Sequence, residues 1–142
     1  MDSQGIDSQK VIRIAAALIR RADGRTLLVR KCNTTAFMQP GGKIEASEQP
    51  AAALRRELSE ELGLELDPDE LTYVGRFTAP AANEPGRFVD AEIFSFDLFL
   101  PVKPGAEIEE ILWIDPAEVA PVELAPLTRD KLLPLCSRPA GK

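Results

Sequence analysis

Three closely spaced glutamates are the side chains of this sequence best placed to do chemistry. Glu57, Glu60 and Glu61 stand at positions i, i+3 and i+4, a spacing that puts all three on one face of an α-helix. Carboxylates four residues apart repel each other unless a cation lies between them. Clustered carboxylate oxygens suit hard divalent cations, so the spacing favours a Mg²⁺ or Mn²⁺ site. A solvated acidic helix face is the simpler alternative.

The chain contains no histidine, which narrows the chemistry further. Ser-His-Asp and Cys-His mechanisms, histidine-ligated zinc and histidine phosphotransfer are all excluded. A general base must then be a carboxylate, a lysine, a tyrosine or a water activated by a metal ion. The formal net charge of −6 argues against binding nucleic-acid polymers or acidic membranes. A phosphorylated small molecule stays compatible, because bound cations reverse the local sign.

One helix is expected to carry the glutamates. Pro50 suits its first turn, where a missing N–H does no harm, and Gly63 suits its end as a C-cap. Leucines repeat along a second stripe of the same helix, which predicts the side that packs on a core: Leu54, Leu58 and Leu62.

Apolar runs before and after this helix predict the strands that must support it. Some of these runs are apolar on both faces, as in strands covered on both sides. The order of strands, helix, strands and helix predicts an α/β fold with a mixed sheet between helices. The expected strands are residues 10–19, 26–31, 72–78, 90–100 and 111–114, with a brief helix from Asp115 and a final helix over residues 126–135.

Length and composition predict one cytoplasmic domain. At 142 residues the chain fits a single domain, which we place at residues 10–138 after a flexible leader at residues 1–9. No apolar run approaches the ~18 to 20 residues of a membrane span, and the N-terminal segment lacks the apolar centre of a signal peptide. Cys32 and Cys136 have no ligand spacing, which favours two reduced thiols.

Residues 42–64 match a longer pattern than the glutamates alone. They read Gly, five residues, Glu, seven residues, then Arg-Glu-apolar-any-Glu-Glu-any-Gly-apolar. Seven fixed identities coincide by chance with a probability on the order of 10⁻⁸ per starting position. This is the signature of the Nudix hydrolases, and the chain resembles that MutT-like family at every fixed position. The resemblance implies an α/β/α sandwich with a mixed central sheet.

The resemblance also implies an activity and a metal site. Nudix hydrolases cleave a phosphoanhydride bond of a nucleoside diphosphate linked to another moiety, with Mg²⁺ or Mn²⁺ as cofactor. By resemblance, Glu57 and Glu61 are metal ligands, Glu60 is a ligand or a water-positioning base, and the carbonyl oxygen of Gly41 is a further ligand. Arg56 would orient a catalytic carboxylate or hold the preceding loop.

A base outside the motif is also expected by resemblance. Some relatives use a glutamate there, and Glu109 or Glu110 in the segment before Trp113 could fill that role. The simpler alternative for both is a solvated acidic loop.

Residues that flank the motif are expected to determine the substrate specificity. Arg30 and Lys31 precede the glycine turn and could contact phosphate, although such cations commonly cap a strand edge. By resemblance, the substrate is expected to be a (modified) nucleoside triphosphate or an ADP-sugar such as ADP-ribose. Pro80 stands where the family's ADP-sugar pyrophosphatases have a proline. The candidates for reading the base or sugar are Phe37, Gln39, Asn83 and Glu84, and Trp113 could also stack on a base. Aromatic residues near strands are more often core, and Asn83 and Glu84 could simply serve a turn.

One other function class stays open at the level of sequence, and a second is disfavoured. A Nudix-fold module could bind a nucleotide or a partner without hydrolysis, since a fold does not fix a function. An isomerase acting on an isoprenoid diphosphate would need a cysteine and acid pair that the sequence does not supply. The family resemblance also allows a homodimer, although no segment predicts its interface.

Overall fold

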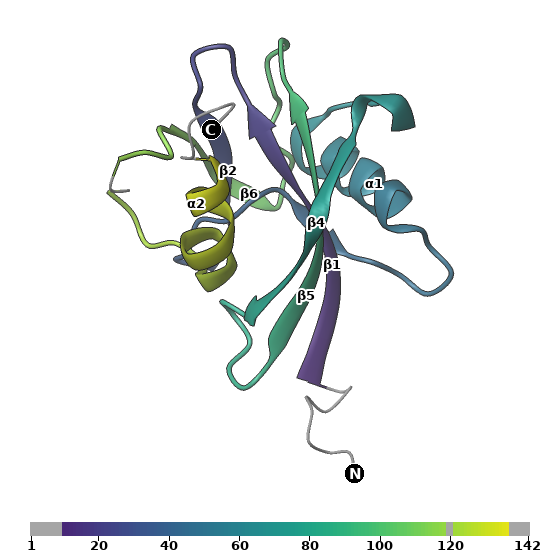
Figure 1. The fold of residues 1–142 in the computed structure, drawn as a ribbon, viewed down its shortest axis with the longest axis vertical. Helices are drawn as coiled ribbons and strands as arrows, with labels where there is room; N and C mark the ends of the chain where they lie inside the picture. The colour runs from purple at the N-terminus through teal and green to yellow at the C-terminus, as the bar shows by residue number, and fades with distance from the viewer. Residues whose placement is uncertain (1–9, 119–120, 137–142) are drawn as a thin grey trace.

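The computed structural model describes residues 10–118 and 121–136 (Figure 1). The leader expected at residues 1–9 lies outside this range. The strands are β1 (Val11–Arg20), β2 (Thr26–Lys31), β3 (Gly41–Lys43), β4 (Thr72–Pro80), β5 (Phe88–Asp97) and β6 (Ile108–Ile114). The helical elements are α1 (Pro50–Leu62), the short 3₁₀ helix η2 (Pro68–Glu70), the π-helical segment η3 (Thr128–Leu132) and α2 (Leu133–Cys136).

The strands form one mixed sheet, as the sequence predicts. Its order is β4-β5-β1-β2-β6, and β3 pairs with β1 away from this path. β1 and β5 run parallel, whereas the other pairs are antiparallel. Since Gly41 pairs with Ala16 and Gly42 with Ala15, the start of the glutamate motif is fixed against the middle of the sheet.

Helices cover both faces of this sheet. α1 and α2 lie on opposite sides of it (Figure 1). Because side chains alternate along a strand, Ala15 and Ala17 of β1 join the core under α1, whereas Ala16 and Leu18 join a second core with Leu132. The α/β/α arrangement is therefore confirmed.

The boundaries of α1 follow from its sequence. Pro50 occupies the first turn, and Gly63 ends the helix in the left-handed conformation with φ of 67°. The carbonyl oxygens of Leu58 and Ser59 accept hydrogen bonds from the backbone beyond the helix end, which satisfies groups that a helix terminus leaves free. The leucine stripe is fully buried and sets the rotation of the helix.

Three local features differ from the predicted elements. The glycine turn becomes the short strand β3, because Gly41–Lys43 hydrogen-bonds to β1. The brief helix expected from Asp115 is a turn as far as residue 118, although the Asp115 side chain accepts a hydrogen bond from the Ala117 N–H at 2.9 Å as an N-cap does. The final helix begins at the expected place but contains the π-helical segment η3.

Two predictions about the whole chain can also be compared with the structure. Cys32 and Cys136 are separate free thiols, as expected. Within the described residues, no helix has both the length and the apolar character needed to cross a bilayer.

Candidate active site

Glu61 is the most buried charged group of the motif, with 5% of its surface exposed. Its Oε1 accepts a hydrogen bond from the Gly41 N–H at 3.2 Å, and its Oε2 lies 3.5 Å from Lys31 Nζ. Burial raises the pKa of Glu61 to about 7, even though Lys31 opposes the shift. The protein therefore holds a carboxylate whose negative charge is incompletely compensated.

Glu57 lies one helical turn before Glu61 and faces the same strand. Its Oε2 accepts a hydrogen bond from Arg56 Nη1 at 2.9 Å. Gly42 leaves the space for its carboxylate, because a Cβ at residue 42 would stand 2.6 Å from Glu57 Oε2. The negative charge of Glu57 also contributes to the raised pKa of Glu61, which places the two carboxylates within electrostatic reach of each other.

Glu60 is placed differently from the other two glutamates. Its side chain is 63% exposed, and its Oε1 lies 4.0 Å from Arg56 Nη1. Successive helical residues are rotated by about 100°, so burial of Glu61 turns Glu60 toward solvent. Within the described part of the chain, no three Asp, Glu, Cys or His side chains are gathered into a ready-made metal site.

The pair of Glu57 and Glu61 nevertheless fits a divalent cation. Both are oxygen donors, the ligand type that Mg²⁺ and Mn²⁺ prefer. The raised pKa of Glu61 reflects a buried anion with too little positive charge nearby. Glu57, Glu61 and the adjacent Gly41 backbone are the groups that would hold the ion, and exposed Glu60 is free to join them.

Arg56 joins the loop before α1 to the glutamate pair. Its Nε and Nη2 donate to the two carboxylate oxygens of Glu48, each at 2.9 Å, and Nη2 also donates to the Lys43 carbonyl oxygen at 3.2 Å. This guanidinium and the Glu45 N–H lower the pKa of Glu48 to about 2. Since Nη1 holds Glu57, Arg56 positions that carboxylate.

The two cations at the end of β2 have different surroundings. Lys31 faces the buried Glu61, whereas Arg30 Nε donates to Glu110 Oε1 at 2.8 Å. Neighbouring strand residues point to opposite faces, so the structure brings only Lys31 to the glutamate pair. Glu110 is more than half exposed, and the Glu109 carboxylate accepts a hydrogen bond from Cys32 Sγ, so these contacts do not link either glutamate to the site.

A cleft opens beside Gly41 and Gly42, with a volume of about 170 Å³. Lys31, Gln39, Asn83 and Glu84 line it, together with apolar side chains of β1. Four residues that the sequence singles out for phosphate or base contact therefore surround one space next to the glutamate pair.

Phe37 does not line this cleft, so the structure does not bring this candidate for base stacking to the site. It is buried in a core cluster with Leu28, Ile114 and Leu133, because its backbone pairs with Leu124 and turns the ring inward. Trp113 lies away from the cleft lining as well, with the Arg21 guanidinium 4.6 Å above its ring.

Sequence reasoning missed two residues beside the cleft. Met38 lines it directly. Thr128 donates a hydrogen bond to Gln39 Oε1 at 2.7 Å and lines a smaller adjoining cavity. A polar residue on the apolar side of the last helical segment was the available signal for Thr128, although such residues occur commonly without a function.

Comparison with known proteins agrees with the fold and with the motif. The NUDIX domain family model matches residues 10–136. The chain therefore belongs to the NUDIX domain family. Its α/β/α sandwich resembles the crystal structure of the MutT protein from Methanosarcina mazei Go1, with a TM-score of 0.74 and 24% identity over 93% of this chain and 96% of that one; this likeness shows the fold alone.

Two curated relatives carry names that state an activity. The CTP pyrophosphohydrolase of Escherichia coli (strain K12) is 32% identical over 122 residues, which cover 82% of this chain and 85% of the relative. The 8-oxo-dGTP diphosphatase of Haemophilus influenzae is 42% identical over 60 residues, or 39% of this chain. The chain spans only 44% of that relative's length in this match.

Proposed function

We propose that this protein is a Mg²⁺- or Mn²⁺-dependent pyrophosphohydrolase that cleaves a phosphoanhydride bond of a nucleoside triphosphate. The observation that carries the proposal is the buried Glu61 carboxylate, which lies one helical turn from Glu57 and accepts a hydrogen bond from the glycine strand that lines a cleft. The relatives named for CTP and 8-oxo-dGTP support a nucleoside triphosphate over an ADP-sugar. Nudix hydrolases generally use divalent ions, which agrees with the donor set.

Each residue of the site has a separate role in the proposed reaction. When bound, a divalent ion supplies charge neutralisation for the phosphates and lowers the pKa of water. Glu57 and Glu61 hold that charge at the glycine strand, and Arg56 keeps Glu57 in place. Lys31 reaches the same region and can bind a phosphate oxygen. Exposed Glu60 is free to orient the attacking water or accept its proton.

A panel of nucleotides tests this function. Wild-type protein is incubated with nucleoside triphosphates, ADP-ribose and other ADP-sugars, with Mg²⁺, Mn²⁺ or EDTA, and the products are identified. We expect a nucleoside monophosphate and pyrophosphate from at least one triphosphate, and no product with EDTA. Nucleotide-induced thermal stabilisation without turnover across the panel would instead favour the non-catalytic binding module.

A further inference from the structure

Two carbonyl groups at the end of α1 are capped by a distant segment. A helix leaves its last carbonyl oxygens without partners inside the helix, and the residues just after α1 satisfy those of Leu58 and Ser59. The Glu61 carbonyl oxygen instead accepts a hydrogen bond from the Gly105 N–H at 2.7 Å, and that of Leu62 accepts one from the Lys103 N–H at 2.9 Å. The backbone of a proposed metal ligand is therefore held by the loop between β5 and β6.

Gly105 lies closer to α1 than a side chain would permit. A Cβ atom at residue 105 would stand 2.2 Å from the Glu60 carbonyl oxygen, whereas Cβ contacts shorter than 3.0 Å are essentially never seen. The atom in the way belongs to the backbone, which cannot rotate aside as the end of a side chain can. Any residue larger than glycine would therefore push the last turn of α1 away by most of an ångström.

The same loop is joined to the end of β2. The Ile108 N–H donates a hydrogen bond to the Gly105 carbonyl oxygen at 3.1 Å. Ile108 also pairs with Lys31 in the sheet, and the Lys31 ammonium faces Glu61. Residues 103–108 therefore form a clamp that connects the backbone of Glu61 with the strand that carries its charged partner.

We propose that Gly105 is a positioning residue of the active centre, because through the clamp it fixes the Glu61 carboxylate relative to Lys31. The inference rests on the proposed function, since the group that is positioned is the proposed metal ligand. Gly105 acts through Glu61 and not on the substrate itself. Functional groups must be held within about 0.5 Å of their productive geometry, and a displacement of about 1 Å can cost a hundredfold in rate.

Alanine at residue 105 tests this role in a variant. We expect Gly105→Ala to weaken Mn²⁺ binding at least about tenfold and to lower kcat about tenfold or more, with a smaller change in KM, because the Glu61 backbone is displaced. Calorimetry measures the Mn²⁺ affinity of the folded variant. Gly24→Ala is the matched control: Gly24 has φ of 88°, so alanine there also costs stability. Because Gly24 lies at the opposite end of β2 from Lys31, this control should keep the wild-type Mn²⁺ affinity and kcat.

Amide hydrogen exchange of the wild-type protein tests the same link without any variant. Exchange of the Gly105 N–H requires the clamp to open and to break its hydrogen bond with Glu61. If the open clamp no longer binds the ion, Mg²⁺ at one hundred times its Kd should slow this exchange about a hundredfold. The Gly24 N–H, which donates to the Arg21 carbonyl oxygen at 2.9 Å, should exchange at an unchanged rate.

The outcomes separate this inference from the proposed function. If wild type hydrolyses a triphosphate but Mg²⁺ leaves the exchange of Gly105 unchanged, or folded Gly105→Ala keeps the wild-type Mn²⁺ affinity and kcat, the positioning role is overturned and the hydrolase function stands. If Gly105→Ala does not fold, the exchange experiment decides alone. If no nucleotide is hydrolysed, the function fails, and positioning is judged by exchange and Mn²⁺ affinity: slowed exchange with weakened affinity supports it. A wild-type protein that binds no Mn²⁺ would contradict both.

Discussion

The charge of Glu61 is the feature on which the proposed chemistry of this site depends. Glu61 is buried against the Gly41 N–H and Lys31. Keeping this carboxylate ionised costs free energy, because burial disfavours the charged form. The same cost makes the carboxylate a strong attractor for a cation. In the proposed function, a bound divalent ion would offset this cost.

The cost of keeping buried Glu61 ionised should be measurable as a pH-dependent loss of stability in the metal-free protein. The pKa of Glu61 is about 7, above its usual value of 4.5, so the favourable contribution of this group to stability is complete below about pH 4.5 and is lost as pH rises through 7. We expect the free energy of unfolding of wild type to fall relative to that of Glu61→Gln by roughly 2 to 3 kcal/mol between pH 5 and pH 8. Urea denaturation in EDTA measures the difference, and Glu118→Gln at an exposed glutamate should follow wild type. Parallel curves for wild type and Glu61→Gln would show that Glu61 is not strained.

At the scale of elements, α1 and β3 act together. The helix supplies both carboxylates, and the glycines of β3 let the backbone approach them. Gly41 has φ of 150°, and a Cβ there would stand 2.7 Å from the Ala16 Cα atom. A Cβ at Gly42 would instead meet the flexible end of the Glu57 side chain. Gly41 is therefore needed for the close approach of β3 to β1, and Gly42 for the position of the Glu57 carboxylate.

Replacing Gly41 and Gly42 by alanine, one at a time, should distinguish their two roles. We expect Gly42→Ala to lower kcat by at least about tenfold through displacement of the Glu57 carboxylate, with a small loss of stability. Gly41→Ala meets backbone atoms that cannot move aside, so it should destabilise the fold by more than 2 kcal/mol. Thermal unfolding and kcat are measured for both variants. Equal stability of the two variants would refute this division.

Much of α1 could be predicted from sequence because its signals are local. Pro50, Gly63 and the leucine stripe define the helix without reference to the rest of the chain. The spacing of Glu57 and Glu61 likewise indicates a shared face. It does not reveal that Glu60 turns outward, because that depends on which side of α1 the sheet and Lys31 cover.

Contacts between distant segments account for what sequence reasoning missed. Gln39 and Thr128 are 89 residues apart, and no periodic pattern links them. The sequence allows Phe37 to be either a stacking residue or a core residue, and its pairing with Leu124 is what places it in the core. The mixed sheet was predictable from the order of elements, whereas the parallel pairing of β1 with β5 is a property of the assembled sheet.

At the scale of the whole molecule, metal binding should be linked to folding. An ion that binds only the folded state stabilises it by about 2.7 kcal/mol at one hundred times its Kd. We expect Mg²⁺ and Mn²⁺ to raise the Tm of wild type and Glu118→Gln in a concentration-dependent way. Glu61→Gln should lose most of this shift. A shift of the same size in Glu61→Gln would place the ion elsewhere.

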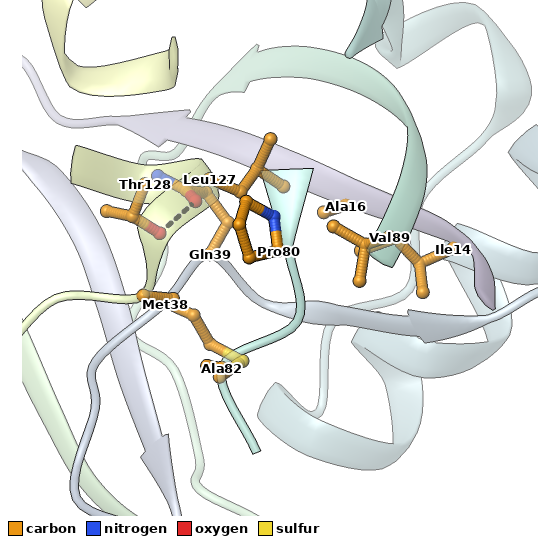
Figure 2. A pocket seen from close by; sticks show the side chains of 10 residues that line it. Ile14, Ala16, Met38, Gln39, Pro80, Ala82, Val89, Leu127 and Thr128 are labelled. Atoms are coloured by element: carbon orange, nitrogen blue, oxygen red, sulfur yellow. Dashed lines mark hydrogen bonds between the residues drawn. The ribbon is translucent and has the colours of Figure 1, made fainter. Parts of the chain in front are cut away.

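The sheet connects the cleft with the smaller cavity beside it. Ile14 and Ala16 of β1 line both the cleft beside the glycine strand and the adjoining cavity (Figure 2), so one strand supports the two spaces.

The most direct test of the central claim is the turnover of a hydrolysable nucleoside triphosphate by wild type and Glu61→Gln at saturating Mg²⁺. We predict that Glu61→Gln lowers kcat for pyrophosphate release by about a hundredfold or more, with a smaller change in KM, because it removes charge needed in the transition state. Equal turnover by the two proteins would contradict the assignment of this carboxylate pair as the catalytic centre.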